Sequence, residues 1–83
     1  MPSLIAVSLQ DLIQKLSPRQ REIVVLLCEG KNARQIAIIL NIGRETVVSH
    51  IRVACHKLNV SNRVQLIVMF VQWRMLMDLE KRE

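Results

Sequence analysis

Apolar residues recur along most of the chain at the three- and four-residue spacing of amphipathic α-helices, interrupted by short polar breaks. The clearest helix start is "LSPRQREIVVLL", where Ser17 precedes Pro18 and Gln20 stands three positions after Ser17. A serine cap, a proline at the first helical position and a glutamine at the third are typical of a capping box. We therefore predict a helix from Pro18 to Glu29 that stops at Gly30, a residue suited to a left-handed helix end.

Two further helical segments in the middle of the chain are joined by a very short connection. "NARQIAIIL" predicts a short helix capped by Asn32, and the following Asn41 is a residue type that tolerates a positive φ. Only Ile42 and Gly43 separate Asn41 from the next helix, which is predicted over Arg44 to Leu58. With so short a connection the two helices must cross steeply, as in a helix-turn-helix.

Both ends of the chain continue the helical pattern. A shorter helix over about Ser8 to Lys15 precedes the first capping box, and a last helix, capped by Ser61 or Asn62, runs to a short polar tail. The sequence has two Gly and two Pro, which leaves little turn chemistry for β-hairpins. The predicted fold class is all-α, a four-helix bundle with a short extra N-terminal helix. We divide it into a helical extension over residues 1–15 and a domain over residues 16–83.

Charge is concentrated in one part of the chain, whose formal net charge is +5. The segment from Lys31 to Arg63 has six bases against a single acid, Glu45, whereas the remaining residues sum to zero. A basic segment beside neutral flanks suits a polyanion, either nucleic acid or an anionic membrane surface. A solvated face with a chance excess of bases is the alternative. No membrane partner is expected, because no aromatic belt adjoins the charged face.

The helix predicted over residues 44–58 has two distinct faces when its residues are placed at intervals of about 100°. The buried face consists of Val47, His50, Ile51, Ala54 and Leu58. The opposite face carries Glu45, Ser49, Arg52, Val53 and His56, with Arg44 and Val48 on one side of it and Thr46 and Lys57 on the other. A polar face with many donors and one acid is typical of a helix that enters the DNA major groove, so double-stranded DNA is the expected partner.

The last helix carries two apolar stripes on opposite sides. One consists of Val64, Ile67, Val68, Val71, Met75 and Leu79, and the other of Leu66, Met69, Phe70, Trp73, Leu76 and Met77. A small domain can cover one stripe with its own core, and the second needs a partner, most simply another copy of the chain. The alternative is a helix buried entirely within one chain. The pattern does not decide which stripe faces the partner.

Other kinds of chemistry find little support in the sequence. Cys28 and Cys55 lie far apart in apolar surroundings, without CxxC or Cys/His ligand spacing, so we expect two buried thiols in a reducing cytoplasm and neither a metal nor a cofactor. His50 and His56 have no nucleophile or paired carboxylate at a usable spacing, so an enzyme is not expected. The N-terminus lacks the basic region of a signal peptide, and the apolar run of the last helix contains Arg74 and is too short to span a bilayer.

Several motifs, taken in their order along the chain, resemble the LuxR-type (FixJ/NarL-type) DNA-binding domain of bacterial transcription factors over residues 16 to about 68. The shared elements are Leu16 followed by "SPRQRE", Gly30, "QIA" at 35–37, Leu40, Ile42, "TVVSH" at 46–50, "KL" at 57–58 and "NRVQ" at 62–65. The resemblance implies a four-helix fold whose third helix reads the major groove and whose fourth helix forms a homodimer.

The resemblance also implies roles for individual residues. Val48, Ser49 and Arg52 are expected to face base edges, and the expected phosphate contacts are Asn32, Arg44, Thr46, Lys57 and Arg63. The candidates for the dimer interface are Val64, Val68, Met69, Gln72, Trp73, Met75 and Leu76. Three positions depart from the family pattern, and one of them, Gln20 in place of a usual Glu, is a conservative change inside the capping box. Gly43 stands where Ser or Thr usually caps the helix, and Val48 stands where many members carry Lys, so this position offers a thymine methyl an apolar contact in place of a cation.

We therefore predict a sequence-specific transcriptional regulator that binds DNA as a homodimer in the cytoplasm. The alternative is an interaction protein that pairs with a related LuxR-type regulator and sequesters it, and RNA polymerase is a further candidate partner. Members of the family usually carry a phosphoacceptor or ligand-sensing domain ahead of this one. Met1 followed by an extra helix favours a small stand-alone regulator over an excised domain.

Overall fold

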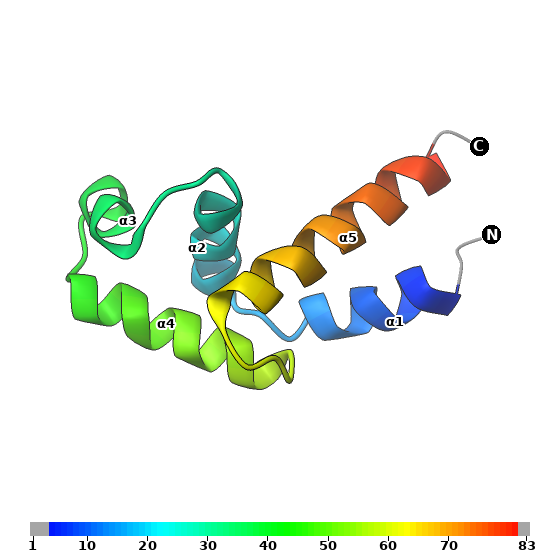
Figure 1. The fold of residues 1–83 in the computed structure, drawn as a ribbon, viewed down its shortest axis with the longest axis horizontal. Helices are drawn as coiled ribbons and strands as arrows, with labels where there is room; N and C mark the ends of the chain where they lie inside the picture. The colour runs from blue at the N-terminus through cyan, green and yellow to red at the C-terminus, as the bar shows by residue number, and fades with distance from the viewer. Residues whose placement is uncertain (1–3, 82–83) are drawn as a thin grey trace.

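Residues 4–81 are described by the computed structural model as five α-helices joined by short connections (Figure 1). These are α1 (Leu4–Ile13), α2 (Pro18–Cys28), α3 (Ala33–Leu40), α4 (Arg44–Lys57) and α5 (Arg63–Lys81). The described residues contain no strand, and the all-α prediction is confirmed. The N-terminal helix is present, but it begins and ends earlier than predicted. It ends because the backbone tightens after Ile13, where the N–H of Leu16 donates to the Ile13 carbonyl three residues back.

Reciprocal side-chain caps set the starts of α2 and α3. In α2 the Gln20 N–H donates to Ser17 Oγ at 3.1 Å, and the Ser17 N–H donates to Gln20 Oε1 at 2.9 Å. These bonds complete the predicted capping box. The start of α3 has the same arrangement between Asn32 and Gln35, with both bonds at 2.9 Å. Each pair satisfies two backbone donors that would otherwise lack a partner at a helix start.

The starts of α5 and α4 differ from this pattern. Of the two candidate caps for α5, Asn62 supplies the side chain: its Oδ1 accepts the Gln65 N–H at 3.0 Å. The return bond runs from the Ser61 N–H to Gln65 Oε1 at 2.8 Å, so this reciprocal pair spans one residue more than a capping box. The cap residue of α4 is Gly43, which forms no side-chain bond. The amides in the first turn of α4 therefore have no side-chain acceptor from the cap position.

Left-handed backbone terminates three of the helices. Gly30 follows α2 with φ of 88°, Asn41 ends α3 with φ of 55°, and Asn59 follows α4 with φ of 56°. Glycine and asparagine adopt this region at the lowest cost, and the positive φ expected at Asn41 is confirmed. The sharp change of direction at Asn41 sends the chain from α3 into α4, and the two helices cross as a helix-turn-helix (Figure 1).

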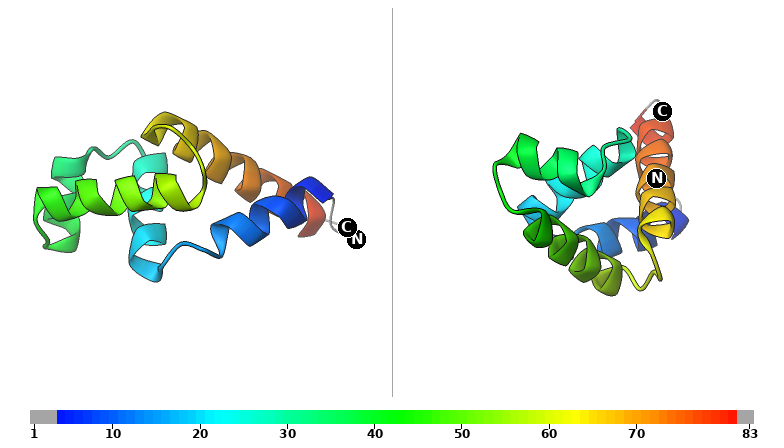
Figure 2. Two further views of the ribbon diagram at one scale, coloured as in Figure 1. Left: turned by 90° about the horizontal axis from the view of Figure 1, so that it is seen from below. Right: turned by 60° about the vertical axis from the view of Figure 1, so that its left-hand side comes forward.

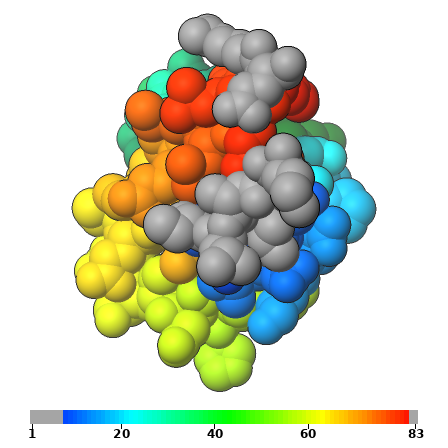
Figure 3. All heavy atoms as spheres, turned by 90° about the vertical axis from the view of Figure 1, so that its right-hand side faces the viewer, coloured from blue at the N-terminus to red at the C-terminus, as the bar shows by residue number. Residues whose placement is uncertain are grey.

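The helices form one elongated molecule with extents of 41 × 23 × 20 Å (Figures 1 and 2). Helices α2, α3 and α4 pack together as the helix-turn-helix body, and α5 extends away from it. Helix α1 runs beside α5 in the opposite direction, at the end of the molecule that Figure 3 faces. The two are joined by a bond of 2.7 Å from Trp73 Nε1 to Gln10 Oε1. Arg21 of α2 also fixes the end of α1, because its Nη2 donates to the Ile13 carbonyl at 3.2 Å.

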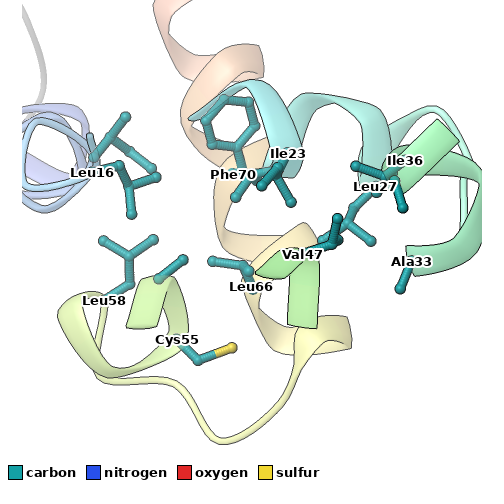
Figure 4. Packing of buried hydrophobic residues seen from close by; sticks show 14 residues of the cluster. Leu16, Ile23, Leu27, Ala33, Ile36, Val47, Cys55, Leu58, Leu66 and Phe70 are labelled. Carbon is teal, nitrogen blue, oxygen red and sulfur yellow. The ribbon is translucent and has the colours of Figure 1, made fainter. Parts of the chain in front are cut away.

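A single, largely aliphatic core joins all five helices (Figure 4). Its largest fully buried side chains, each less than 2% exposed, are Ile13, Ile23, Val24, Ile36, Val47, Leu58, Leu66 and Phe70. Because every helix contributes to this set, the close packing holds α4 in one orientation against α2 and α3. None of the described helices combines the length and apolarity that crossing a bilayer requires.

Candidate nucleic-acid interface

The outer face of α4 is open to solvent, whereas its inner face lies in the core. Val47 and Ala54 are fully buried, and Cys55 joins them on the inner side. The outer side consists of the exposed residues Glu45, Ser49, Arg52, Val53 and His56, as the periodicity predicts. One prediction was wrong: His50 is half-buried and lines a hollow with Gln20 and Thr46 instead of lying in the core. Gln20, in the first turn of α2, borders α4 at this hollow.

The three residues expected to face base edges lie together on this outer side. Val48, Ser49 and Arg52 line one shallow hollow with Arg44 and Glu45. Ser49 and Arg52 are exposed, while Val48 is half-buried and packs against the core. Residues four apart on a helix are neighbours, so Arg44, Val48 and Arg52 form one row along α4. The hollow therefore presents an apolar surface, a hydroxyl and a guanidinium group side by side.

One flank of this face is formed by Thr46 and Lys57. Thr46 is exposed, and Lys57 is half-buried at the end of α4. Lys57 Nζ donates to Gln20 Oε1 at 2.9 Å, and Gln20 itself is only 7% exposed. An ammonium group has three donors, so two remain for an anion after this bond. The side-chain amide of Gln20 therefore holds Lys57 in place. Because this amide is neutral, it does not cancel the positive charge of Lys57.

The other flank brings arginines from three helices together. Arg34, Arg44 and Arg63 line a hollow with Asn32 and Ala33, which we call the three-arginine hollow. Asn32, Arg44 and Arg63 were expected to contact phosphate, and the fold places them at one site. Arg34 was not singled out by the sequence. Its position near the start of a helix within the basic segment was the available signal, but its distance from the other arginines depends on how α3, α4 and α5 cross.

Helix α5 turns its two stripes in opposite directions. Leu66 and Phe70 enter the core, and the exposed apolar residues on the other side are Val64, Val68, Val71, Met75 and Leu79. We call this second set the exposed stripe.

Of the residues expected at a dimer interface, Val64, Val68 and Met75 belong to it, and Gln72 is also exposed. Met69 and Trp73 instead pack against the chain's own core, and Leu76 is half-buried beside Leu9 of α1. Val71 and Leu79 complete the stripe but were left out of the candidates.

Comparison with known proteins places this architecture in a family. Residues 14–70 match the family described as bacterial regulatory proteins, luxR family. The chain is 38% identical over 65 residues to the nitrate/nitrite response regulator protein NarP of Escherichia coli (strain K12), which covers 78% of the chain and 30% of that relative. It is 42% identical over 53 residues to the spore germination protein GerE of Bacillus subtilis (strain 168), covering 64% of the chain and 72% of GerE.

A third relative is the transcriptional regulatory protein DesR of Bacillus subtilis (strain 168), 36% identical over 62 residues, with 71% of the chain and 31% of DesR covered. The chain thus spans about a third of the length of NarP and of DesR. No solved structure gave a significant match. The family match covers more than half of the chain and includes the whole helix-turn-helix. The chain therefore belongs to the LuxR family of bacterial regulatory proteins.

Proposed function

We propose that this chain is a sequence-specific transcriptional regulator whose α4 enters the major groove of double-stranded DNA. The arrangement around α4 carries the proposal: an open outer face with Ser49 and Arg52, Lys57 on one flank, and the three-arginine hollow on the other. The major groove is about 12 Å wide and admits one α-helix between two phosphate backbones. A helix with base-reading side chains outward and cations on both sides fits that shape.

Base discrimination falls to Val48, Ser49 and Arg52 in this proposal. The guanidinium group of Arg52 has the geometry to donate two bonds to O6 and N7 of guanine, and the Ser49 hydroxyl can donate or accept. Val48 suits the methyl group of a thymine, because its half-buried side chain is held against the core. Thr46 and Lys57 would contact phosphates on one side, and Asn32, Arg44 and Arg63 those on the other.

We further propose that the regulator is a homodimer joined through the exposed stripe of α5. The stripe's apolar side chains face solvent along most of a 19-residue helix, and a two-fold pair of such helices would bury both. A dimer places two copies of α4 on successive turns of the duplex, about 34 Å apart. The names of NarP and DesR, a response regulator and a transcriptional regulatory protein, support a role in transcription, which takes place in the bacterial cytoplasm.

Selection of binding sites from random duplexes tests this function. The expected product is an inverted repeat whose half-sites lie about one helical turn apart, bound with an affinity that falls steeply as salt is raised. Enrichment of no sequence, with no retarded complex at low salt, would contradict it.

The exposed stripe favours a second candidate function, that of a protein which pairs with a related LuxR-type regulator and sequesters it. Here the stripe would serve a heterodimer, and Val48 would weaken the chain's own contact with DNA. Mixing the chain with such a regulator distinguishes the two. Release of the regulator from its operator, together with no DNA binding by the chain alone, would favour sequestration.

A further inference from the structure

The three-arginine hollow is built from parts of the sequence that only the fold brings together. Arg34 is the second residue of α3, Arg44 is the first of α4, and Arg63 is the first of α5. With Asn32 and Ala33 they line an open surface hollow of about 410 Å³. Its charged lining residues are therefore all arginines, and each comes from a different helix.

The electrostatics of this hollow favour an anion. Each guanidinium group carries a positive charge, so the three charges repel one another unless a counter-charge lies between them. Glu45, which follows Arg44 in the chain, lines the neighbouring hollow on the outer face of α4 and not this one. The ion pair between Arg19 and Glu22 lies on the surface of α2, outside this hollow. An anion held between the arginines would relieve the repulsion.

The shape of the donors points to a phosphate group. Each guanidinium group presents paired N–H donors that match two phosphate oxygens, which a point charge such as an ammonium does not. Asn32 and Ala33 mark the start of α3, where the helix dipole adds a partial positive charge. The arginines supply the binding, and the helix start reinforces it.

We propose that the three-arginine hollow holds a single phosphate of the DNA backbone, contacted at once by Arg34, Arg44 and Arg63. The inference rests on the proposed function, and it adds Arg34 and the joint action of three helices to it. The contact positions the protein on the duplex and reads no sequence. Because Arg63 begins α5, this phosphate also ties the helix with the exposed stripe to the same DNA strand as the start of α4.

The first test compares Arg34→Ala and Arg63→Ala with Arg74→Ala, which removes the same charge from an exposed position on α5 outside the hollow. Affinity is measured by fluorescence anisotropy on the selected site and on an unrelated duplex, over a range of salt. We expect both hollow variants to bind about tenfold more weakly on both duplexes, and the slope of log affinity against log salt to fall by about one. Arg74→Ala should keep the wild-type values. If both hollow variants bind like wild type with an unchanged slope, the inference is wrong while the proposed function stands.

The second test locates the phosphate. Single methylphosphonates, which remove one backbone charge, are placed in turn along one half-site. One position should weaken wild-type binding about as much as Arg34→Ala does, and should add little to the loss in that variant. If the losses simply add at every position, Arg34 acts through general charge, and the single-phosphate contact is wrong.

A third measurement needs no DNA. Inorganic phosphate is titrated into wild type and Arg34→Ala. The amide NMR signals of residues 33 and 34 and of their immediate neighbours in the chain are followed. Saturable shifts in wild type that are lost in the variant support the hollow as a phosphate site. If these shifts occur but wild type binds no duplex, the hollow takes a small anion, and the assignment to DNA is overturned together with the proposed function.

Discussion

Lys57, the last residue of α4, donates from Nζ to Oε1 of Gln20 in the first turn of α2, at 2.9 Å. The same oxygen accepts the N–H of Ser17 in the capping box, so the helix start and the expected phosphate contact share one acceptor. Gln20 is uncharged, and its bond therefore orients the ammonium group without neutralising it.

Gln20→Glu tests this arrangement. A carboxylate keeps both hydrogen bonds but forms an ion pair with Lys57, which lowers the positive charge available to a phosphate. We expect affinity for all duplexes to fall by about three- to tenfold, with a shallower salt dependence, while the melting temperature stays the same or rises. Gln14→Glu is the control, because it makes the same charge change at an exposed position between α1 and α2. Equal losses in the two variants would show that Lys57 is not the cause.

Met75→Lys tests the exposed stripe. Met75 is 61% exposed in the single chain, so a lysine there leaves the core intact, but it would place a charge between two apolar helices in the dimer. In sedimentation, the dissociation constant of the dimer should rise at least about tenfold. The helix content should not change. Ile38→Lys, at a site on α3 that is 74% exposed, is the matched control and should leave the dimer unaffected. A wild-type chain that sediments as a monomer at micromolar concentration would rule out the homodimer.

Gln10→Ala tests how α1 is held. Removing the acceptor leaves the indole N–H of Trp73 without its bond to α1, and the free energy of unfolding should fall by about 0.5–1.5 kcal/mol. Trp73 is the single tryptophan of the chain, so its fluorescence should shift to longer wavelength as α1 loosens. Gln72→Ala, at an exposed position of α5, should change neither quantity. An unshifted spectrum with unchanged stability in Gln10→Ala would contradict the contact.

The two thiols predict how stability changes at alkaline pH. Burial raises the pKa of Cys28 and of Cys55 above the ordinary value of 9.0. Near Cys28 the charge of Arg74 opposes this rise, and that of Glu29 adds to it. As pH increases past 9, the unfolded chain loses its thiol protons first, so the free energy of unfolding should decrease between that pH and the higher folded pKa. Urea denaturation of wild type and of Cys28→Ala/Cys55→Ala at several pH values measures the difference. The same alkaline decrease in both proteins would show that the thiols do not contribute to it.

Local signals in the sequence were enough to predict the helices and most of their ends. The capping box of Ser17 and Gln20, the positive φ of Asn41 and the exposed face of α4 all depend on residues within one or two turns of each other. His50 was assigned to the core because periodicity ranks residues by angle alone. Whether a neighbouring helix covers a residue at the edge of the buried face, such as His50, depends on tertiary packing.

Long-range relationships could not be predicted in the same way. Both stripes of α5 are equally apolar in the sequence, and the choice between them is made where α1 packs beside Trp73 and where Phe70 enters the core. Gln20 and Lys57 are 37 residues apart, and the three-arginine hollow needs three helix starts to meet. Such sites depend on crossing angles that no local pattern contains.

Arg52 on α4 is proposed to read a base, and a comparison of Arg52→Ala with Arg52→Lys tests this role. Affinities of wild type and both variants are measured on the selected site and on a duplex in which the half-sites are scrambled. We predict that Arg52→Ala loses about 1–3 kcal/mol on the selected site and much less on the scrambled one. Arg52→Lys should recover binding to the scrambled duplex but not the preference for the site, because lysine keeps the charge and lacks the paired donors. Binding of Arg52→Ala to the selected site with wild-type affinity and preference would show that Arg52 does not read a base.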